Sequence, residues 1–468
     1  MNDLADLSAF ELSQAFRSRR LSPVESTAAV LARIEAGEPH LNAMYVVHRD
    51  AAMQAAREAE QRWQAGAPLS PIDGVGVTIK ENLYTRGDPA PIGVATGSLD
   101  PKPTDSPVAA RLREAGSIIL GKTTMPDFGM LSSGLSSIHG TTRNPWRLDR
   151  NPAGSSSGSG AAAAAGYGPL HVGTDIGGSV RLPAHHCGVF GLKPSLGRIP
   201  LDPPYTGRVA GPLTRSVRDA ALLMDVVSRA DTRDWMSLPP AALDFSEQLE
   251  GLSVAGVRIG LLTDMGCGLP VEAPIVEAVR QAAAALESAG AHIEPVASFM
   301  SAQMLDGVCA FLEARSNLDV SAMPPEQRDR VLPYIVQWAT WRADGFSGRD
   351  VMAAYAQLMA MREAAVRAVG RFDFLLSPTA PIVSYGAHLH SPTDDPRRAL
   401  EHIAFTVAYN MSEQPASSLN WSYHTDGMPI GVQIVGQRFD DLGVMRLSRA
   451  LEQLRPVQRA WPRPWVSA

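Results

Sequence analysis

Two segments rich in glycine and serine carry the residue types of a catalytic serine. The first is Gly-Ser-Ser-Ser-Gly-Ser-Gly at 154–160, and the second is Gly-Thr-Asp-Ile-Gly-Gly-Ser-Val-Arg at 173–181. Consecutive glycines before Ser179 allow several backbone N–H groups to converge on one point, as an oxyanion hole requires. A serine at the rim of such a hole can act as a nucleophile if a base accepts its proton. A tight glycine turn without chemistry is the alternative interpretation.

The first segment admits three further interpretations. A flexible linker is disfavoured because the alanine run 161–165 follows at once, and a phosphate-binding loop because no Gly-Lys-Ser/Thr follows. A nucleophile elbow, Gly-x-Ser-x-Gly, would place the nucleophile at Ser156. The elbow needs a strand in front of it, whereas residues 143–153 are polar and hold two prolines. It also needs a histidine, and nothing singles out His402 or His424.

Lysine is rare in this chain, and its positions are informative. Only four of the 42 basic residues are lysines. A GC-rich genome explains the excess of arginine, yet lysine, unlike arginine, can be buried, neutralised and used as a base. Lys102 lies between two prolines in a surface loop. Lys80, Lys122 and Lys193 follow apolar or glycine-bounded runs and are candidates for buried roles.

The elements that would hold these residues alternate between helices and strands. Two Ser-x-x-Glu capping boxes, Ser8 with Glu11 and Ser22 with Glu25, predict helices near the start of the chain, the second ending near Gly37. Periodicity predicts further helices over 49–64, from 105, over 161–165, 215–229 and 274–289, and strands over 74–80, 117–121, 256–263, 372–377 and 430–436. This alternation favours an α/β fold.

With these patterns in place, the chain resembles the amidase signature family. The resemblance rests on Lys80, on Gly-Ser-Ser at 154–156 and on the segment 173–181. It also includes Pro-Ala and Cys-Gly-Val-Phe-Gly-Leu-Lys-Pro within 183–194, Gly-Pro-Leu at 211–213 with Arg215 and Asp219, and motifs near both ends at 33–43, 377–379 and 427–433. The similarity therefore covers nearly the whole chain.

The resemblance implies a Ser–Ser–Lys triad. It places the nucleophile on Ser179, the relay serine on Ser155 and the base on Lys80, with a cis peptide between Gly154 and Ser155. Lysine can accept a proton only if it is neutral, so burial must lower its pKa. The family usually has glycines where this chain has Ala153 and Ser157, but neither departure removes a member of the triad.

The resemblance also implies the groups around the triad. The backbone N–H groups of Ile176, Gly177, Gly178 and Ser179 would form the oxyanion hole. Gly129 falls where a backbone carbonyl of the family contacts the substrate. Asp175 and Arg181 would support the catalytic loop, and no metal or other cofactor is needed.

The implied fold is one large α/β domain over residues 1–468, with a mixed, mainly parallel central sheet covered by helices on both faces. The catalytic core would span about 70–220. The segment 300–361 holds six methionines together with Tyr334, Trp338, Trp341 and Phe346. It is either an ordinary helical core layer or an adaptable apolar lid over a substrate pocket.

Composition narrows the class of partners. A net charge of −6 offers no basic surface for nucleic acid, and no stretch is apolar and long enough to span a membrane. The odd, widely spaced cysteines Cys187, Cys267 and Cys309 argue against a disulfide framework. The absence of an apolar leader further favours a cytoplasmic protein. A small-molecule substrate is expected, with a homodimer as the default assembly.

The predicted function is hydrolysis of the C–N bond of a small or aryl amide or a carbamate (urethane). One alternative is an amidotransferase A-type subunit that works only with partner proteins. The acidic net charge and the partial match of residues 125–131 to that type of protein count against it. An esterase of the same fold and a catalytically silent scaffold are the remaining alternatives. Adjacent His185, His186 and Cys187 are expected to be structural rather than a metal site.

Overall fold

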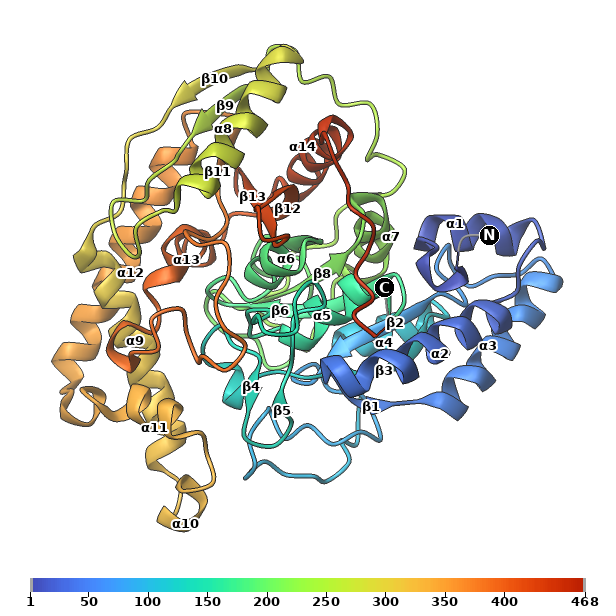
Figure 1. The fold of residues 1–468 in the computed structure, drawn as a ribbon, viewed down its shortest axis with the longest axis horizontal. Helices are drawn as coiled ribbons and strands as arrows, with labels where there is room; N and C mark the ends of the chain where they lie inside the picture. Colours follow the sequence, from blue (N-terminus) through green and yellow to red (C-terminus); the bar gives the residue numbers. More distant parts are fainter. Residues whose placement is uncertain (1–2, 466–468) are drawn as a thin grey trace.

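A single mixed sheet runs through the molecule. The computed structural model describes residues 3–465, and their strands join in the order β1-β3-β2-β6-β8-β7-β12-β13-β11-β9-β10 (Figure 1). The strand bounds are β1 Met44–Val47, β2 Gly76–Lys80, β3 Ile118–Thr123, β6 Leu170–Asp175, β7 Phe190–Lys193, β8 Val209–Thr214, β9 Arg258–Leu261, β10 His292–Pro295, β11 Phe374–Pro378, β12 Ala416–Tyr423 and β13 Pro429–Gly436. A separate small hairpin pairs β4 (Leu135–Ser136) with β5 (Gly140–Thr141).

Parallel pairing occurs in two blocks of this sheet. β3, β2 and β6 form the first block, and β11, β9 and β10 form the second. Between the blocks the strands from β6 through β8, β7, β12 and β13 to β11 pair antiparallel, as does β1 at the edge. The predicted single α/β domain with a mixed sheet is confirmed, and its parallel part lies within these blocks.

Helices cover both faces of the sheet. Side chains alternate between the two faces along each strand, so each face carries apolar residues that helices bury. In β11, Leu376 points to one apolar cluster and Leu375 to the other. The helix bounds are α1 Ala9–Arg17, α2 Pro23–Leu41, α3 Arg49–Gln64, α4 Pro107–Glu114, α5 Ser157–Ala165, α6 Arg181–Cys187, α7 Val217–Val227, α8 Ala273–Ser288, α9 Ala302–Ser321, α10 Pro325–Arg328, α11 Pro333–Thr340, α12 Gly348–Val369, α13 Ala404–Met411 and α14 Asp441–Leu454.

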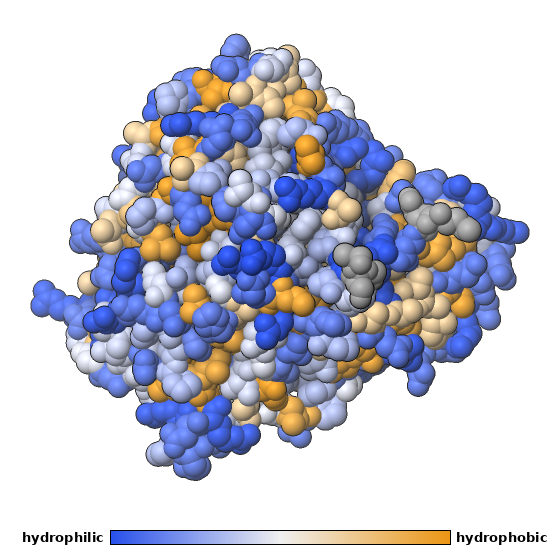
Figure 2. All heavy atoms as spheres, in the orientation of Figure 1, coloured by the Kyte–Doolittle hydropathy of each residue, from blue (hydrophilic) through white to orange (hydrophobic). Residues whose placement is uncertain are grey.

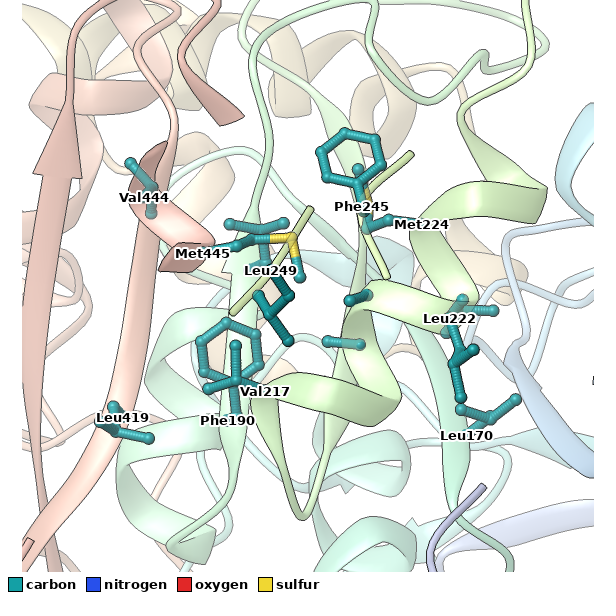
Figure 3. Packing of buried hydrophobic residues seen from close by; sticks show 14 of the residues in the cluster. Leu170, Phe190, Val217, Leu222, Met224, Phe245, Leu249, Leu419, Val444 and Met445 are labelled. Atoms are coloured by element: carbon teal, nitrogen blue, oxygen red, sulfur yellow. The ribbon is translucent and has the colours of Figure 1, made fainter. Parts of the chain in front are cut away.

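The largest core lies between the sheet and helices α1, α4, α7, α8 and α14. Figure 3 shows residues of this core, among them Val217 and Met224 of α7, Met445 of α14 and Phe190 of β7. The opposite face carries α5 and α6 over the middle of the sheet, with a second cluster formed by α9, α11, α12 and α13. These last helices lie together at the left of the molecule in Figure 1.

Both predicted capping boxes are present, and they start α1 and α2. The predicted end of α2 at Gly37 is wrong. The helix continues to Leu41 and ends at Asn42, which adopts the left-handed conformation (φ 51°). Gly37 serves packing instead, because a Cβ there would lie 2.2 Å from the Tyr167 hydroxyl.

The strands predicted from apolar runs lie at β2, β3, β9, β11 and β13. Four central strands, β6, β7, β8 and β12, were not predicted. They carry glycine, proline or buried serine, such as Gly211 and Pro212 in β8 and Ser417 and Ser418 in β12. Such residues are depleted in strands in general, so pairing with neighbouring strands decides their conformation here.

The surface in Figure 2 is mostly hydrophilic, with apolar residues scattered over this face. No helix in the described part of the chain combines the length and the apolar character needed to cross a membrane.

Candidate active site

Lys80 is the last residue of β2, and its side chain is fully buried beneath two serine-bearing loops. Its Nζ lies within hydrogen-bond distance of Ser155 Oγ at 2.8 Å, Thr174 Oγ1 at 3.0 Å and Ser156 Oγ at 3.1 Å. All three partners are neutral hydroxyls. Within residues 3–465, no carboxylate lies within 4.0 Å of Nζ.

This environment favours the neutral amine. Burial lowers the pKa of Lys80 well below its ordinary value, and the positive charge of Arg208 lowers it further against the weaker opposing effect of Asp175. A buried cation without a counterion loses its solvation and gains no compensating ion pair. Lys80 therefore gives up its proton more readily than an exposed lysine does.

Ser155 lies in the loop that leads into α5. The peptide bond between Gly154 and Ser155 is cis, as the resemblance implies. Gly154 packs so closely that a Cβ would lie 2.6 Å from the carbonyl oxygen of Ser133. Ser155 is 4% exposed and lines a cleft together with Ser179, which is 9% exposed. Its hydroxyl thus lies between the buried lysine and open space.

Ser156 does not act as the nucleophile of an elbow. Its side chain is fully buried and donates to the carbonyl oxygen of Thr174 at 3.1 Å. Its backbone N–H donates to the carbonyl oxygen of Ser179 at 3.2 Å, which ties the two loops together. In the described chain, neither His402 nor His424 forms a hydrogen bond with it. Ser156 therefore holds the loop and the lysine in place.

The loop 176–179 joins the carboxyl end of β6 to α6. Asp175 organises it by accepting hydrogen bonds from the backbone N–H groups of Gly178 at 2.7 Å and Val180 at 3.1 Å. The Gly178 N–H is thus already engaged, although the sequence predicts it as an oxyanion donor. Among residues 3–465, no protein group accepts from the N–H groups of Ile176, Gly177 or Ser179. These three remain the candidate donors of the oxyanion hole.

Arg181 supports this loop from below. It is fully buried and donates to both carboxylate oxygens of Asp175 at 3.0 Å. It also donates to Asn410 Oδ1 at 2.6 Å in α13 and to Gln433 Oε1 at 2.8 Å in β13. Burial alone would raise the pKa of Asp175, but the Arg181 charge, the hydrogen bonds that Arg181 donates to Asp175 and a further one from Asn410 Nδ2 at 2.9 Å hold it below its ordinary value. Asp175 and Arg181 thus form a fully buried ion pair next to the loop, and the supporting role stays a prediction.

The cleft beside Ser179 has two lobes. The lobe with more polar side chains, called the polar lobe, has a volume of about 270 Å³, and the apolar lobe has a volume of about 70 Å³. Gly129, Ile176, Ser179 and Arg315 line both lobes. The polar lobe is completed mainly by Asn82, Tyr84, Phe128, Ser155, Thr174, Tyr205 and Arg208, and the apolar lobe by Met130, Leu131, Gly177, Leu312, Trp338, Leu400 and Ile403.

Sequence reasoning missed most of these lining residues. Asn82 and Tyr84 follow directly on Lys80, and residues just beyond the carboxyl end of a parallel strand commonly line a site. That position was a usable signal for both. Arg208 and Arg315 carry no such local signal, because distant elements bring them to the cleft. Trp338 belongs to the segment 300–361, for which the sequence offers a pocket lid as one interpretation.

The segment 300–361 folds into α9–α11 and most of α12. It contributes Leu312, Arg315, Ser316 and Trp338 to the wall of the apolar lobe. None of its six methionines is among the described lining residues, and Met352 and Met359 are exposed. Trp338 and Leu312 therefore supply the apolar part of this wall, and Arg315 and Ser316 supply the polar part.

The other candidates from the sequence have structural contacts. Lys193 is fully buried, and its Nζ donates to the carbonyl oxygen of Pro194 at 2.9 Å. Lys122 is also fully buried and donates to the carbonyl oxygen of Leu83.

Burial raises the pKa of the Cys187 thiol, which disfavours the thiolate. His185 contacts backbone groups of Gly431 and Ile382 through its ring nitrogens.

The fold and this arrangement define a hydrolase built on one large mixed sheet, and comparisons with known proteins agree. The family model "Amidase" matches residues 25–445. The chain is 33% identical to an acylamidase of Rhodococcus erythropolis over 96% of each protein. It is also 33% identical to the A-type subunit of the glutamyl-tRNA(Gln) amidotransferase of Symbiobacterium thermophilum, over 97% of this chain and 98% of that protein.

Solved structures give the same result. A bacterial aryl acylamidase of the amidase signature family matches with a TM-score of 0.88 and 29% identity, over 96% of both chains. A 6-aminohexanoate cyclic dimer hydrolase matches with a TM-score of 0.85 and 29% identity, over 98% of this chain and 99% of that one. The chain belongs to the amidase signature family and is an enzyme of that family.

Proposed function

We propose that this protein hydrolyses the C–N bond of a small or aryl amide or a carbamate through an acyl-enzyme on Ser179. Ser155 relays protons, and Lys80 is the base. The observation that carries the proposal is the 2.8 Å contact between the Lys80 amine and the Ser155 hydroxyl, in a site where no carboxylate of the described residues pairs with the lysine. A neutral lysine at the end of a hydroxyl relay is a means of activating serine.

The proposed chemistry runs in two halves. Ser179 Oγ attacks the carbonyl carbon and gives its proton to Ser155, whose own proton passes to Lys80. The N–H groups of Ile176, Gly177 and Ser179 stabilise the oxyanion. When the tetrahedral intermediate collapses, the C–N bond breaks and the relay protonates the departing amine. Water then attacks the ester by the same route and releases the acid and free Ser179.

The apolar lobe supports a substrate with an apolar or aryl portion. Leu312, Trp338 and Ile403 line it, and Ser179 lies at its edge. The acylamidase relative and the aryl acylamidase neighbour bear names of the same chemistry. We accordingly propose the helices of 300–361 as the substrate-side wall of the domain.

The test is a matched set in which one aryl group is presented as amide, carbamate and ester. Purified wild type is expected to hydrolyse the amide or the carbamate, while Ser179→Ala hydrolyses none of the three. Equal rates for wild type and Ser179→Ala would overturn the assignment of the nucleophile. Turnover of the ester alone would move the assignment to an esterase.

The relay has its own matched pair of variants. Ser155→Ala removes the hydroxyl that contacts Lys80, and we expect a loss of kcat on the order of 10³-fold. Ser157→Ala is the control, because Ser157 Oγ is buried and has no hydrogen-bond partner within residues 3–465. Equal activity of Ser155→Ala and Ser157→Ala would overturn the relay.

A second candidate function is that of an amidotransferase A-type subunit, which the relative from Symbiobacterium thermophilum favours. Such a protein would depend on its partners and show no turnover alone. Affinity purification from the native host discriminates the two functions, because a member of a complex is expected to be recovered with partners in fixed ratio. A silent scaffold would also fail to turn over substrate but would tolerate Ser179→Ala in the host. Location in the cytoplasm and assembly as a homodimer stay predictions.

A further inference from the structure

The polar lobe contains an arginine that no acidic side chain neutralises. Arg208 is only partly exposed, directly precedes β8, and lines the lobe together with Ser155 and Ser179. Its two terminal nitrogens make only long contacts, at 3.5 Å, with the carbonyl oxygens of Pro203 and Asn82. No carboxylate lies within 4.0 Å of it in the described chain. The terminal N–H groups of Arg208 therefore form only weak hydrogen bonds with these protein groups.

A second arginine faces the same space. Arg315 of α9 lines both lobes, and its guanidinium lies 5.4 Å from the ring centroid of Tyr205. Its acidic neighbour is Asp319, at 3.8 Å, and both side chains of this pair are more than 40% exposed. An exposed pair of this kind contributes little. Burial lowers the pKa of Arg208, and the nearby positive charge of Arg315 acts in the same direction.

Two guanidinium groups that converge on one cleft without a buried acid suit an anionic ligand. Arginine presents planar, paired N–H donors that match the two oxygens of a carboxylate. Tyr84 and Asn82 add polar groups to the same wall. From this juxtaposition we propose that the polar lobe binds a carboxylate carried by the substrate, with Arg208 as the main contact and Arg315 as the second.

The position of Ser155 decides which half of the substrate carries the carboxylate. Ser155 lines the polar lobe and is absent from the described lining of the apolar lobe. In the proposed chemistry, Ser155 delivers the proton to the departing nitrogen, so the amine half lies in the polar lobe. The acyl half then occupies the apolar lobe against Trp338 and Leu312. The substrate class is an N-acylated amino acid, an apolar or aryl acyl group joined to an amine that bears a carboxylate.

This inference rests on the proposed function. Four amides test the carboxylate site and the proposed function separately. Three are benzamides of glycine, propylamine and ethylenediamine, which place an anion, no charge and a cation on the amine half. The fourth is N-phenylsuccinamic acid, which places the carboxylate on the acyl half. Release of acid and amine is followed by chromatography. We expect kcat/KM to decrease in the order anionic, neutral and cationic, and to be low for the fourth.

Arg208→Gln is the deciding variant. It is expected to lower the ratio of kcat/KM for the glycine amide to that for the propylamine amide by roughly tenfold to a hundredfold. The ratio is used because Arg208 also influences the pKa of Lys80, an effect common to both substrates. Arg208→Lys should keep part of the preference. Arg367→Gln, an exposed arginine on α12 paired with Glu363, removes the same charge elsewhere and should leave the ratio at the wild-type value.

The outcomes separate cleanly. A wild-type ratio of one or less, or a ratio unchanged in Arg208→Gln, would overturn the carboxylate site while amide hydrolysis stands. Preference for N-phenylsuccinamic acid would overturn the assignment of the two lobes. No turnover of any amide by wild type would count against the proposed function itself.

Discussion

The Lys80 amine has no carboxylate within 4.0 Å among residues 3–465, and its charge state sets the first prediction. As the pH falls through the lowered pKa of Lys80, the amine takes up a proton and can no longer serve as a base. The kcat/KM of wild type should therefore decline on the acid side. Lys80→Arg, which stays charged, should lose activity on the order of 10³-fold or more at neutral pH.

The pH profile of kcat/KM provides the control for this prediction. Lys193→Met removes a lysine that is equally buried but whose one side-chain hydrogen bond within residues 3–465 goes to the Pro194 carbonyl, and it should keep the acid limb at the wild-type pH. An active Lys80→Arg enzyme with the wild-type profile would contradict the role of Lys80.

The sequence locates individual residues best where they belong to a contiguous motif. Lys80, Ser155 and Ser156 could be located from their motifs, and the structure gathers them within hydrogen-bond distance. The engagement of the Gly178 N–H by Asp175 could not be foreseen, because it depends on the backbone path of one turn. Arg208 is placed by strand pairing in the middle of the sheet, and no local pattern indicates that.

The helix α5 shows how elements built of small residues position the site. Its sequence, Ser-Gly-Ser-Gly followed by five alanines, is buried throughout. A Cβ at Gly158 would lie 2.3 Å from the carbonyl oxygen of Ala43 and 2.5 Å from the backbone nitrogen of Thr124. The start of α5 therefore lies directly on backbone, and this close approach carries Ser155 to Lys80.

Gly158→Ala is expected to lower the free energy of unfolding by about 1–3 kcal/mol, because backbone atoms cannot move aside as a side chain can. Denaturant unfolding followed by circular dichroism measures the change. Gly348→Ala is the matched control, since a Cβ at this first residue of α12 meets nothing within 4 Å. Equal unfolding midpoints for the two variants would contradict the packing argument.

Elements were predictable where local signals are strong. Both capping boxes and the helix over 49–64 lie where the sequence predicts them. The error at Gly37 came from applying a rule for helix ends at a place where tertiary packing against Tyr167 requires a glycine. The strands β7, β8 and β12 were missed because their stability comes from neighbours on both sides rather than from their own composition.

Across the whole molecule, buried lysines make stability depend on pH. Burial lowers the pKa of Lys122 and of Lys193 to about 7, against an ordinary value of 10.5, and that of Lys80 falls as well. Between about pH 7 and 10 the unfolded chain therefore binds more protons than the native chain. The free energy of unfolding should rise with pH in this window, on the order of 1 kcal/mol per pH unit for each lysine.

Denaturant unfolding at a series of pH values checks this rise. Lys122→Met and Lys193→Met should each reduce the slope of the free energy of unfolding against pH, whatever their effect on that free energy at a single pH. Asp219 acts in the opposite direction below pH 7. Burial raises its pKa to about 7, so from about pH 4 to 7 the native chain binds more protons at this group than the unfolded chain does. The contribution of Asp219 to the free energy of unfolding therefore decreases over that range. A flat wild-type curve from pH 7 to 10 would contradict the buried-amine account.

The place of β13 in the sheet has a consequence for the order of events in folding. It is the last strand in sequence, yet it lies between β12 and β11 and supplies Gln433 to Arg181, 252 residues away along the chain. Contacts of such long range form slowly, because closing a long loop costs entropy before any contact repays it. During synthesis on the ribosome, Gln433 can stabilise the loop 176–179 through Arg181 only after residues 429–436 have been made. The enzyme should therefore gain activity late, in one step with closure of the sheet.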